Sequence, residues 1–261
     1  MILENKNKCA CNCTAFKEYH KHSQALDHDV EYIQCESCGM IIVPESTKYN
    51  LSSIYNADYF INVDYGWKGR AKILLTYIKY INIFICLKKM RICDFGAGNG
   101  YLSKLLINNG FNVLAYEPFN QNNTYLEKSY YFSKPFDADV LLMVEVFEHF
   151  TNAFEDIHKI LTDFNNPKLV IFTTRFTDNA IEPIEDWFYL DPDSGHFTLW
   201  SKKSLTLLGE MNGYKFISLD DTFLHIFCKA SDIEMCNNLK ILSIPAKFTV
   251  KVRGVIKRLF K

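Results

Sequence analysis

An acid and three glycines stand close together in the run CDFGAGNG, at residues 93–100. Glycine allows positive φ and lets a ligand approach backbone that a Cβ would shield. Where such a run opens a helix, the amide groups of the first turn face the bound group. The run therefore predicts a cradle for an anionic or adenosyl-type ligand; a tight turn before a packed helix is the structural alternative. The cradle residues are Asp94, Gly96, Ala97, Gly98 and Gly100.

The segments on either side of this run have the pattern of a strand and a helix. Residues 90–93 are short and largely apolar, as in a buried strand, while Leu102, Leu105 and Leu106 fall on one helical face. Gly110 is a plausible helix stop. We therefore expect a strand over 90–95 and a helix over 100–109, with the glycines at their junction.

The spacing of the glycines distinguishes a dinucleotide-binding loop from other cofactor-binding loops. A dinucleotide-binding fingerprint places its third glycine three residues after the second, but Tyr101 occupies that position. The third glycine is Gly100, which gives D-x-G-x-G-x-G. This spacing resembles motif I of the class I S-adenosylmethionine-dependent methyltransferases.

Two downstream segments extend the resemblance. Glu117 ends a second apolar run, and residues 136–150, FDADVLLMVEVFEHF, are similar to the fourth strand and its exit loop in that family. The resemblance implies that Glu117 accepts hydrogen bonds from the cofactor's ribose hydroxyls, which suits a carboxylate. It also implies that Glu145 borders the methionine end of the cofactor. The segment before residue 136 lacks the acid that often binds adenine in the family, so the adenine contact stays unassigned.

Two histidines are candidates for a general base. His149 follows the fourth strand directly, and imidazole titrates near neutral pH. His196 ends a long insertion after the fifth strand, residues 181–196, which is rich in aromatic and acidic residues. In the resembled enzymes such loops build the acceptor pocket, and Trp187 and Tyr189 could face a sugar or an aromatic ring. The alternative is that these aromatic side chains close the core beneath the loop.

The order of segments predicts a doubly wound, Rossmann-like α/β fold. We expect a mostly parallel, seven-stranded sheet with an antiparallel edge hairpin and the ligand at the carboxyl ends of the strands. A small zinc-ribbon-like unit precedes it. The expected strands are 90–95, 112–116, 139–145, 168–174, 214–220 and 222–229, with strand three poorly signalled, and the expected helices are 100–109, 121–129, 152–161 and 202–211. The expected units are 1–48, 49–89 (a helical lid or linker that contains Tyr55, Tyr59 and Trp67), 90–230 and 231–261.

The nine cysteines are unevenly placed, and five fall in the first forty residues. Cys35 and Cys38 form a C-x-x-C knuckle followed by glycine, a spacing that lets two thiolates hold one tetrahedral ion. Cys9, Cys11 and Cys13 compete for the two remaining places. We expect a structural zinc; free reduced thiols and a redox or disulfide role are the alternatives. A zinc knuckle before such a core resembles some bacterial sugar-pathway methyltransferases.

Composition favours a cytoplasmic enzyme. The formal net charge of −1 gives no reason to expect nucleic acid as a partner, and the chain start lacks the apolar core of a signal peptide. Residues 246–261 contain six basic and no acidic side chains, with apolar residues on one helical stripe. This basic amphipathic tail could dock on the domain or a protein partner, or lie on the surface of a membrane.

Taken with the resemblance, these features predict an S-adenosylmethionine-dependent methyltransferase. The expected acceptor is a small molecule, such as a nucleotide-sugar, surface-glycan or secondary-metabolite intermediate. A non-catalytic zinc and adenosyl-ligand binding module is the alternative from a different class, and a dehydrogenase is a more distant one. The intact Asp94, Gly96, Gly98 and Glu117 argue against a degenerate site.

Overall fold

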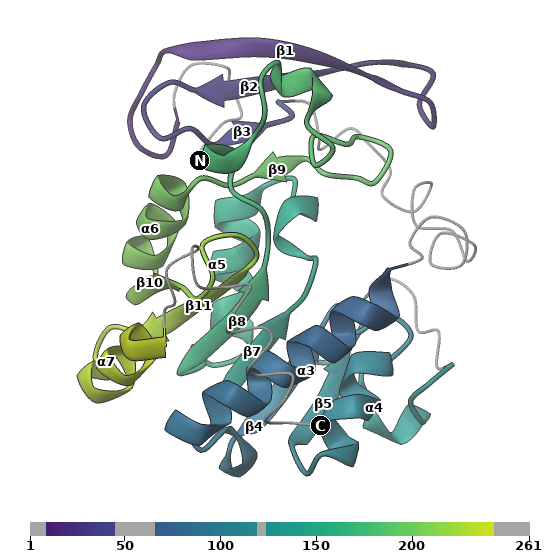
Figure 1. Ribbon diagram of the computed structural model, residues 1–261, viewed down its shortest axis with the longest axis vertical. Coiled ribbons are helices and arrows are strands. Elements are labelled where there is room, and N and C mark those ends of the chain that lie inside the picture. Colours follow the sequence, from purple (N-terminus) through teal and green to yellow (C-terminus); the bar gives the residue numbers. More distant parts are fainter. Residues whose placement is uncertain (1–8, 45–65, 119–123, 243–261) are drawn as a thin grey trace.

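The computed structural model describes residues 9–44, 66–118 and 124–242 (Figure 1). Tyr55, Tyr59 and the basic amphipathic tail lie outside the described residues, so their expected roles stay predictions.

Seven strands form the central sheet, in the order β10-β11-β8-β7-β4-β5-β6. The pairings from β6 through β5, β4 and β7 to β8 are parallel, whereas β11 pairs antiparallel with both β8 and β10. The predicted Rossmann-like α/β fold, with its antiparallel edge hairpin, is therefore confirmed. The strands are β4 (Arg91–Phe95), β5 (Asn112–Tyr116), β6 (Tyr131–Phe132), β7 (Val140–Met143), β8 (Leu169–Thr173), β10 (Tyr214–Ser218) and β11 (Leu224–Lys229).

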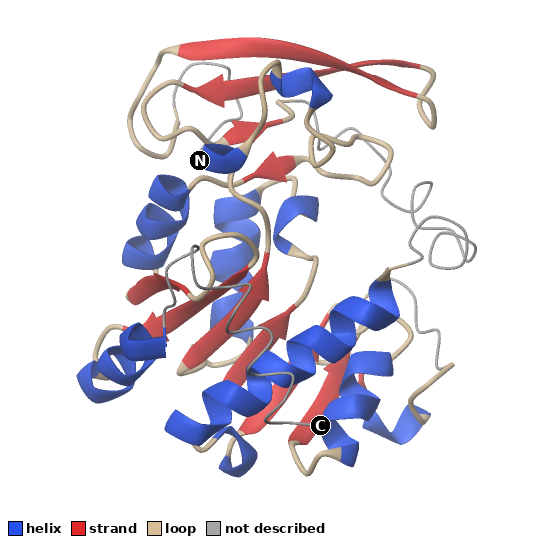
Figure 2. Cartoon of the chain, in the orientation of Figure 1, coloured by secondary structure: helices blue, strands red, loops and turns tan. Residues whose placement is uncertain are grey.

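Helices cover both faces of this sheet (Figure 2). One face packs on α3 (Trp67–Phe84), α4 (Tyr101–Asn108) and α7 (Ile233–Leu242), and the other on α5 (Ala153–Asp163) and α6 (Lys202–Met211). The strands β7 and β8 are almost wholly apolar because both of their faces are buried. In β7, Val140 and Leu142 pack in the core on the side of α3, whereas Leu141 and Met143 pack in the core on the side of α5. Short 3₁₀ helices are η2 (Leu87–Lys89), η3 (Lys128–Tyr130), η4 (Phe147–His149), η5 (Thr177–Asn179) and η6 (Ile184–Asp186).

The helix predicted over 121–129 is wrong for the described part of that segment. Residues 124–127 are irregular, and η3 then leads into β6. The backbone amide of Tyr125 donates to the carbonyl of Asn99 at 3.1 Å, a bond to the glycine loop rather than to a helical turn. Strand three, poorly signalled in the sequence, is the two-residue β6, which is too short to give an apolar pattern.

The amino-terminal segment shares a second sheet with the core. Its strands β1 (Phe16–Ser23), β2 (His28–Cys35) and β3 (Ile41–Ile42) are antiparallel, and β9 (Thr198–Leu199), from the insertion after β8, completes the sheet. This sheet crosses one end of the molecule above α6 (Figure 1). Its core combines Tyr32 with Trp187 and Leu190 of the insertion. The amino-terminal unit and the loop that carries His196 are therefore packed as one body.

No helix in the described ranges combines the length and the apolar character that crossing a bilayer requires.

A buried carboxyl group joins β4 to α4. Asp94 is 3% exposed, and its Oδ2 accepts a hydrogen bond of 2.6 Å from the hydroxyl of Ser103. Burial raises the pKa of Asp94 from 3.8 to about 7; the Ser103 bond opposes this rise and the charge of Glu117 adds to it. The folded chain therefore holds a proton on Asp94 at pH values where the unfolded chain has released it.

We expect Asp94→Asn to stabilise the ligand-free protein at pH 8 more than at pH 5. Between pH 4 and 7 the folded state binds the extra proton, so the wild type loses stability as pH rises through this window, whereas asparagine does not titrate. The difference between the two pH values should be on the order of a few kcal/mol, since one pKa unit corresponds to about 1.4 kcal/mol.

Urea unfolding of both proteins at pH 5 and pH 8 measures this difference. Asp137→Asn, at an exposed position, is the matched control and should show no such pH dependence. An equal effect of Asp94→Asn at both pH values would contradict the assignment of a buried, protonated carboxyl group.

Candidate active site

A cavity of about 890 Å³ lies at the carboxyl ends of β4, β5 and β7. It joins the glycine loop (residues 95–100) to the exit of β7 and to the insertion after β8. This placement follows from parallel pairing, which brings the ends of these strands to one edge of the sheet. Of the residues that the sequence suggested, those lining the cavity are Asp94, Gly96, Ala97, Gly98, Glu117, Glu145, His149 and His196, together with Trp67 and Tyr189.

The backbone conformation of the glycine loop favours glycine at two positions that line the cavity. Gly96 and Gly98 have φ values of 72° and 51°, in the left-handed region that favours glycine. A Cβ at Gly96 would stand 2.9 Å from Val146 Cγ2, closer than packing allows. The amide of Gly98 donates to Glu117 Oε2 at 2.8 Å. The loop therefore presents bare backbone beside a buried carboxylate.

Gly100 has a structural place behind the loop rather than a place on the cavity wall. A Cβ there would lie 2.5 Å from Leu126 Cβ and 2.6 Å from the hydroxyl oxygen of Tyr131. That hydroxyl donates to the carbonyl of Gly98 at 3.0 Å. Gly100 thus lets the edge segment around β6 close against the glycine loop.

Glu145 reaches the cavity through a strained turn after β7. Its φ of 54° is unusual for a residue with a side chain. The hydroxyl of Thr173, at the end of β8, accepts from the Glu145 amide and donates to its Oε1, both at 2.8 Å. Arg70 on α3 approaches the same carboxylate at 3.9 Å. The turn therefore fixes Glu145 between the sheet edge and α3.

The two candidate histidines lie together, with ring centroids 5.2 Å apart. Each ring donates from Nδ1 to a backbone carbonyl: His149 to Gly195 at 3.0 Å and His196 to Tyr189 at 2.9 Å. Burial and the neighbouring His196 lower the pKa of His149 to about 3, and burial also lowers the pKa of His196. Both rings are neutral near pH 7, but a group of such low pKa is a weak general base.

Glu148 directly precedes His149 in the chain, and its carboxylate lies close to both histidines. Its carboxylate is fully buried, and neither oxygen has a hydrogen-bond partner of good geometry among the described residues. Burial, and then the charge of Glu145, raise its pKa well above 4.5, while Tyr189 and Arg70 oppose the rise. Glu148, His149 and His196 place one potential ligand atom each within 4.8 Å of one another.

Of the aromatic residues in the insertion, one packs in the core and two line the cavity. Trp187 is 3% exposed and lies in the core shared with the amino-terminal sheet, and it is not among the cavity residues. Tyr189 is also buried but reaches the cavity wall. Phe188, which the sequence did not single out, is 69% exposed and lines the cavity beneath the guanidinium of Arg175, 5.6 Å from the ring centroid.

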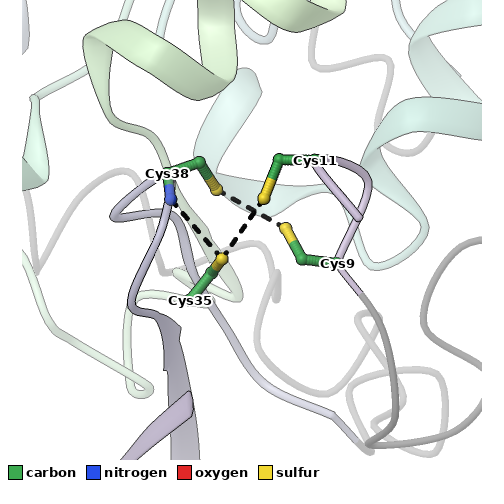
Figure 3. Close-up of side chains that lie close together, drawn as sticks. All are labelled: Cys9, Cys11, Cys35 and Cys38. Atoms are coloured by element: carbon green, nitrogen blue, oxygen red, sulfur yellow. Dashed lines mark hydrogen bonds between the residues drawn. The ribbon is translucent and has the colours of Figure 1, made fainter. Parts of the chain in front are cut away.

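Four of the five amino-terminal cysteines converge outside this cavity. The Sγ atoms of Cys9 and Cys38, and those of Cys11 and Cys35, are each 3.5 Å apart, and all four side chains point to one centre (Figure 3). Cys13 is not in this four-cysteine cluster; its sulfur contacts the backbone of Ala15. A tetrahedral zinc with Zn–S bonds of about 2.3 Å separates its sulfurs by about 3.8 Å, so the cluster is close to that size.

Several residues that shape the site carried little signal in the sequence. Ser103, Thr173 and Tyr131 act through hydrogen bonds to residues on other elements, which no local pattern reveals. Glu148 could have been suspected because it directly precedes His149. Its burial without a partner, however, depends on how the insertion folds over it.

Solved structures with a similar fold include several methyltransferases. The methyltransferase domain of bacterial CtHen1-C is 18% identical, with 61% of this chain and 96% of that chain covered and a TM-score of 0.40. Magnesium protoporphyrin IX methyltransferase from Synechocystis is 14% identical, with 68% and 87% covered and a TM-score of 0.43. Human N-acetylserotonin methyltransferase is 12% identical, with 70% and 59% covered and a TM-score of 0.48. No curated protein sequence matches the chain.

The chain also matches a protein-family model. Residues 70–219 match the model described as a methyltransferase domain, a span that runs from within α3 to the residue after β10. The match covers more than half of the chain and contains the glycine loop, Glu117 and the three clustered side chains Glu148, His149 and His196. The chain therefore belongs to the methyltransferase-domain family.

Proposed function

We propose that the protein is a class I methyltransferase that transfers a methyl group from S-adenosylmethionine to a small-molecule acceptor. The observation that carries the proposal is one cavity that contains both the glycine loop with Glu117 and the side chains Glu148, His149 and His196. A donor held at the first group of residues and an acceptor held at the second would meet inside the same cavity.

The residues around the glycine loop fit an adenosyl cofactor. Gly96 and Gly98 leave backbone exposed to the cavity, and the Glu117 carboxylate beside them is an acceptor for two ribose hydroxyls. Glu145 also lines the cavity, with Arg70 3.9 Å from its carboxylate, and we assign the charged methionine end of the cofactor to its neighbourhood. When bound, S-adenosylmethionine supplies an electrophilic methyl group on its sulfonium, and the protein's task is alignment.

The cavity offers an acceptor both basic and aromatic side chains. Arg70, Lys159 and Arg175 line it among a larger number of acidic side chains, and Phe188 and Tyr189 offer aromatic surface for a ring. Arginine forks match phosphate and carboxylate groups. These features favour a phosphorylated or carboxylated small molecule, of which a nucleotide-sugar is one class; surface-glycan and secondary-metabolite intermediates are others.

We assign a structural zinc ion to the four-cysteine cluster. The amide of Cys38 donates to Cys35 Sγ at 3.5 Å, an interaction that stabilises a thiolate in a C-x-x-C knuckle. The knuckle is anchored on the core: Ser201 Oγ donates to the carbonyl of Cys38, and Thr177 Oγ1 donates to that of Gly39 at 2.7 Å. A zinc there would hold the amino-terminal sheet against the start of α6, at the edge of the insertion that carries His196.

The cofactor assignment predicts that S-adenosylmethionine and S-adenosylhomocysteine bind and that NAD does not. Glu117→Ala should weaken binding by roughly 1–3 kcal/mol through lost hydrogen bonds to the ribose. Gly98→Val should abolish binding because its side chain would occupy space that the cofactor needs. Titration calorimetry measures these affinities.

Glu210→Ala, at an exposed site on α6, is the matched control and should bind the cofactor like the wild type. Wild-type affinity in both Glu117→Ala and Gly98→Val would overturn the cofactor assignment. Tight cofactor binding without methylated product, across acceptors suggested by adjacent genes, would favour a non-catalytic binding module.

The zinc assignment predicts one zinc ion per chain in protein purified without chelator. Cys11→Ser and Cys38→Ser should each lose the ion and loosen the amino-terminal sheet, since structural zinc sites contribute folding energy. Cys13→Ser is the matched control and should keep the ion, because its sulfur lies outside the cluster. Mass spectrometry measures the zinc content of the wild type and the three variants. A zinc-free wild type would refute the assignment, and so would equal zinc loss in Cys13→Ser.

A further inference from the structure

Glu148, His149 and His196 form a compact cluster at the wall of the cavity, referred to below as the Glu–His–His cluster. Its members come from two distant segments, η4 and the insertion after β8. Three hydrogen bonds hold these segments together: the Phe197 amide to the Glu148 carbonyl at 2.8 Å, Thr198 Oγ1 to the Phe150 carbonyl at 2.7 Å, and Trp200 Nε1 to the Phe147 carbonyl at 2.9 Å. The cluster is therefore built into the fold and does not depend on mobile side chains meeting.

The carboxylate of Glu148 is the least satisfied polar group in this cluster. Both oxygens are buried, and neither makes a hydrogen bond of good geometry with the described residues. Leaving a buried acceptor unsatisfied destabilises the folded state, and more so when the group is charged. A cation bound at this point would offset that cost, whereas a packing role would be served better by an apolar side chain.

Each of the two imidazole rings is oriented by a hydrogen bond from its Nδ1. The Nδ1–H of His149 and that of His196 each donate to a backbone carbonyl, so each neutral ring carries its lone pair on Nε2. Histidines that bind metals in proteins are characteristically oriented by such a bond from the other ring nitrogen. One ring nitrogen of each histidine and one carboxylate oxygen of Glu148 lie within 4.8 Å of one another, a set of two imidazoles and one carboxylate.

We propose that Glu148, His149 and His196 bind a divalent first-row transition-metal ion, with the remaining coordination positions open to the cavity. Two imidazoles and one carboxylate suit Mn²⁺, Fe²⁺, Co²⁺ or Zn²⁺ better than Ca²⁺, which prefers oxygen ligands alone. The site is distinct from the four-cysteine cluster, whose ligands are all thiolates.

The open coordination positions indicate what kind of acceptor the metal would bind, an extension that rests on the proposed function. Two neighbouring oxygens of the acceptor, as in a vicinal diol or a hydroxy acid, could chelate the ion beside the methyl donor. The metal would lower the pKa of the hydroxyl that it binds. Transfer then forms one C–O bond, breaks the C–S bond of the sulfonium, leaves that electron pair on a neutral thioether and releases the hydroxyl proton to water.

Manganese binding to the full chain, with the four-cysteine cluster already loaded with zinc, tests the site directly. Mn²⁺ alone is the probe, because thiolate sites take it poorly. Electron paramagnetic resonance measures free Mn²⁺, and its pulsed form detects nitrogen from coordinating imidazole. We expect one bound Mn²⁺ per wild-type chain, with nitrogen couplings from two rings.

His196→Ala should remove one nitrogen coupling and weaken Mn²⁺ binding on the order of 100-fold. Glu148→Gln keeps the side-chain shape, removes the charge and should weaken binding by a similar factor. His158→Ala and Glu210→Gln replace exposed residues outside the cavity and are the matched controls, expected to bind like the wild type. Unchanged binding in His196→Ala and Glu148→Gln, or a wild type that leaves millimolar Mn²⁺ free, would overturn the proposal.

Calorimetric titration of S-adenosylhomocysteine into the same proteins separates this proposal from the proposed function. His196→Ala should keep the cofactor affinity while it loses Mn²⁺. A wild type that binds Mn²⁺ but not S-adenosylhomocysteine would refute the methyltransferase proposal and leave the metal site standing. A wild type that binds S-adenosylhomocysteine but not Mn²⁺ would refute the metal-site proposal alone.

Discussion

Parallel pairing of β5, β4, β7 and β8 is the constraint on which the rest of the structure depends. Because the four strands run in the same direction, their carboxyl ends meet at one edge of the sheet. The glycine loop leaves β4, Glu117 leaves β5, and the turn with Glu145 leaves β7. Thr173, at the end of β8, bonds to Glu145 across that edge. The sheet thus concentrates the chemistry-bearing groups of four separate segments in one cavity.

The insertion after β8 completes this cavity and ties it to the amino-terminal sheet. Its strand β9 pairs with β3, and the hydroxyl of Tyr32 on β2 donates to the carbonyl of His196 at 3.0 Å. The four-cysteine cluster, which includes Cys35 at the end of β2, is anchored on Ser201 at the start of α6. A zinc in that cluster would therefore act on the active site indirectly, by fixing the frame that holds His196.

The sequence alone was sufficient to predict the main features of the fold, because its strands and glycine motif are local patterns. β7 and β8 are almost continuously apolar, and β4 leads directly into the glycine motif. Features set by tertiary contacts were not predictable. The segment before β6 bonds to the glycine loop and forms no α-helix in its described part, and Trp187 packs under the amino-terminal sheet. The burial of the Glu148 carboxyl group is likewise a tertiary feature, set by the insertion that folds over it.

The central claim is that donor and acceptor groups share one cavity, and a crystal structure of the protein with S-adenosylhomocysteine tests it most directly. We expect the ribose hydroxyls within hydrogen-bond distance of the Glu117 carboxylate and the cofactor sulfur facing the Glu–His–His cluster. An adenosyl ligand bound outside this cavity, or a sulfur directed away from the cluster, would contradict the claim.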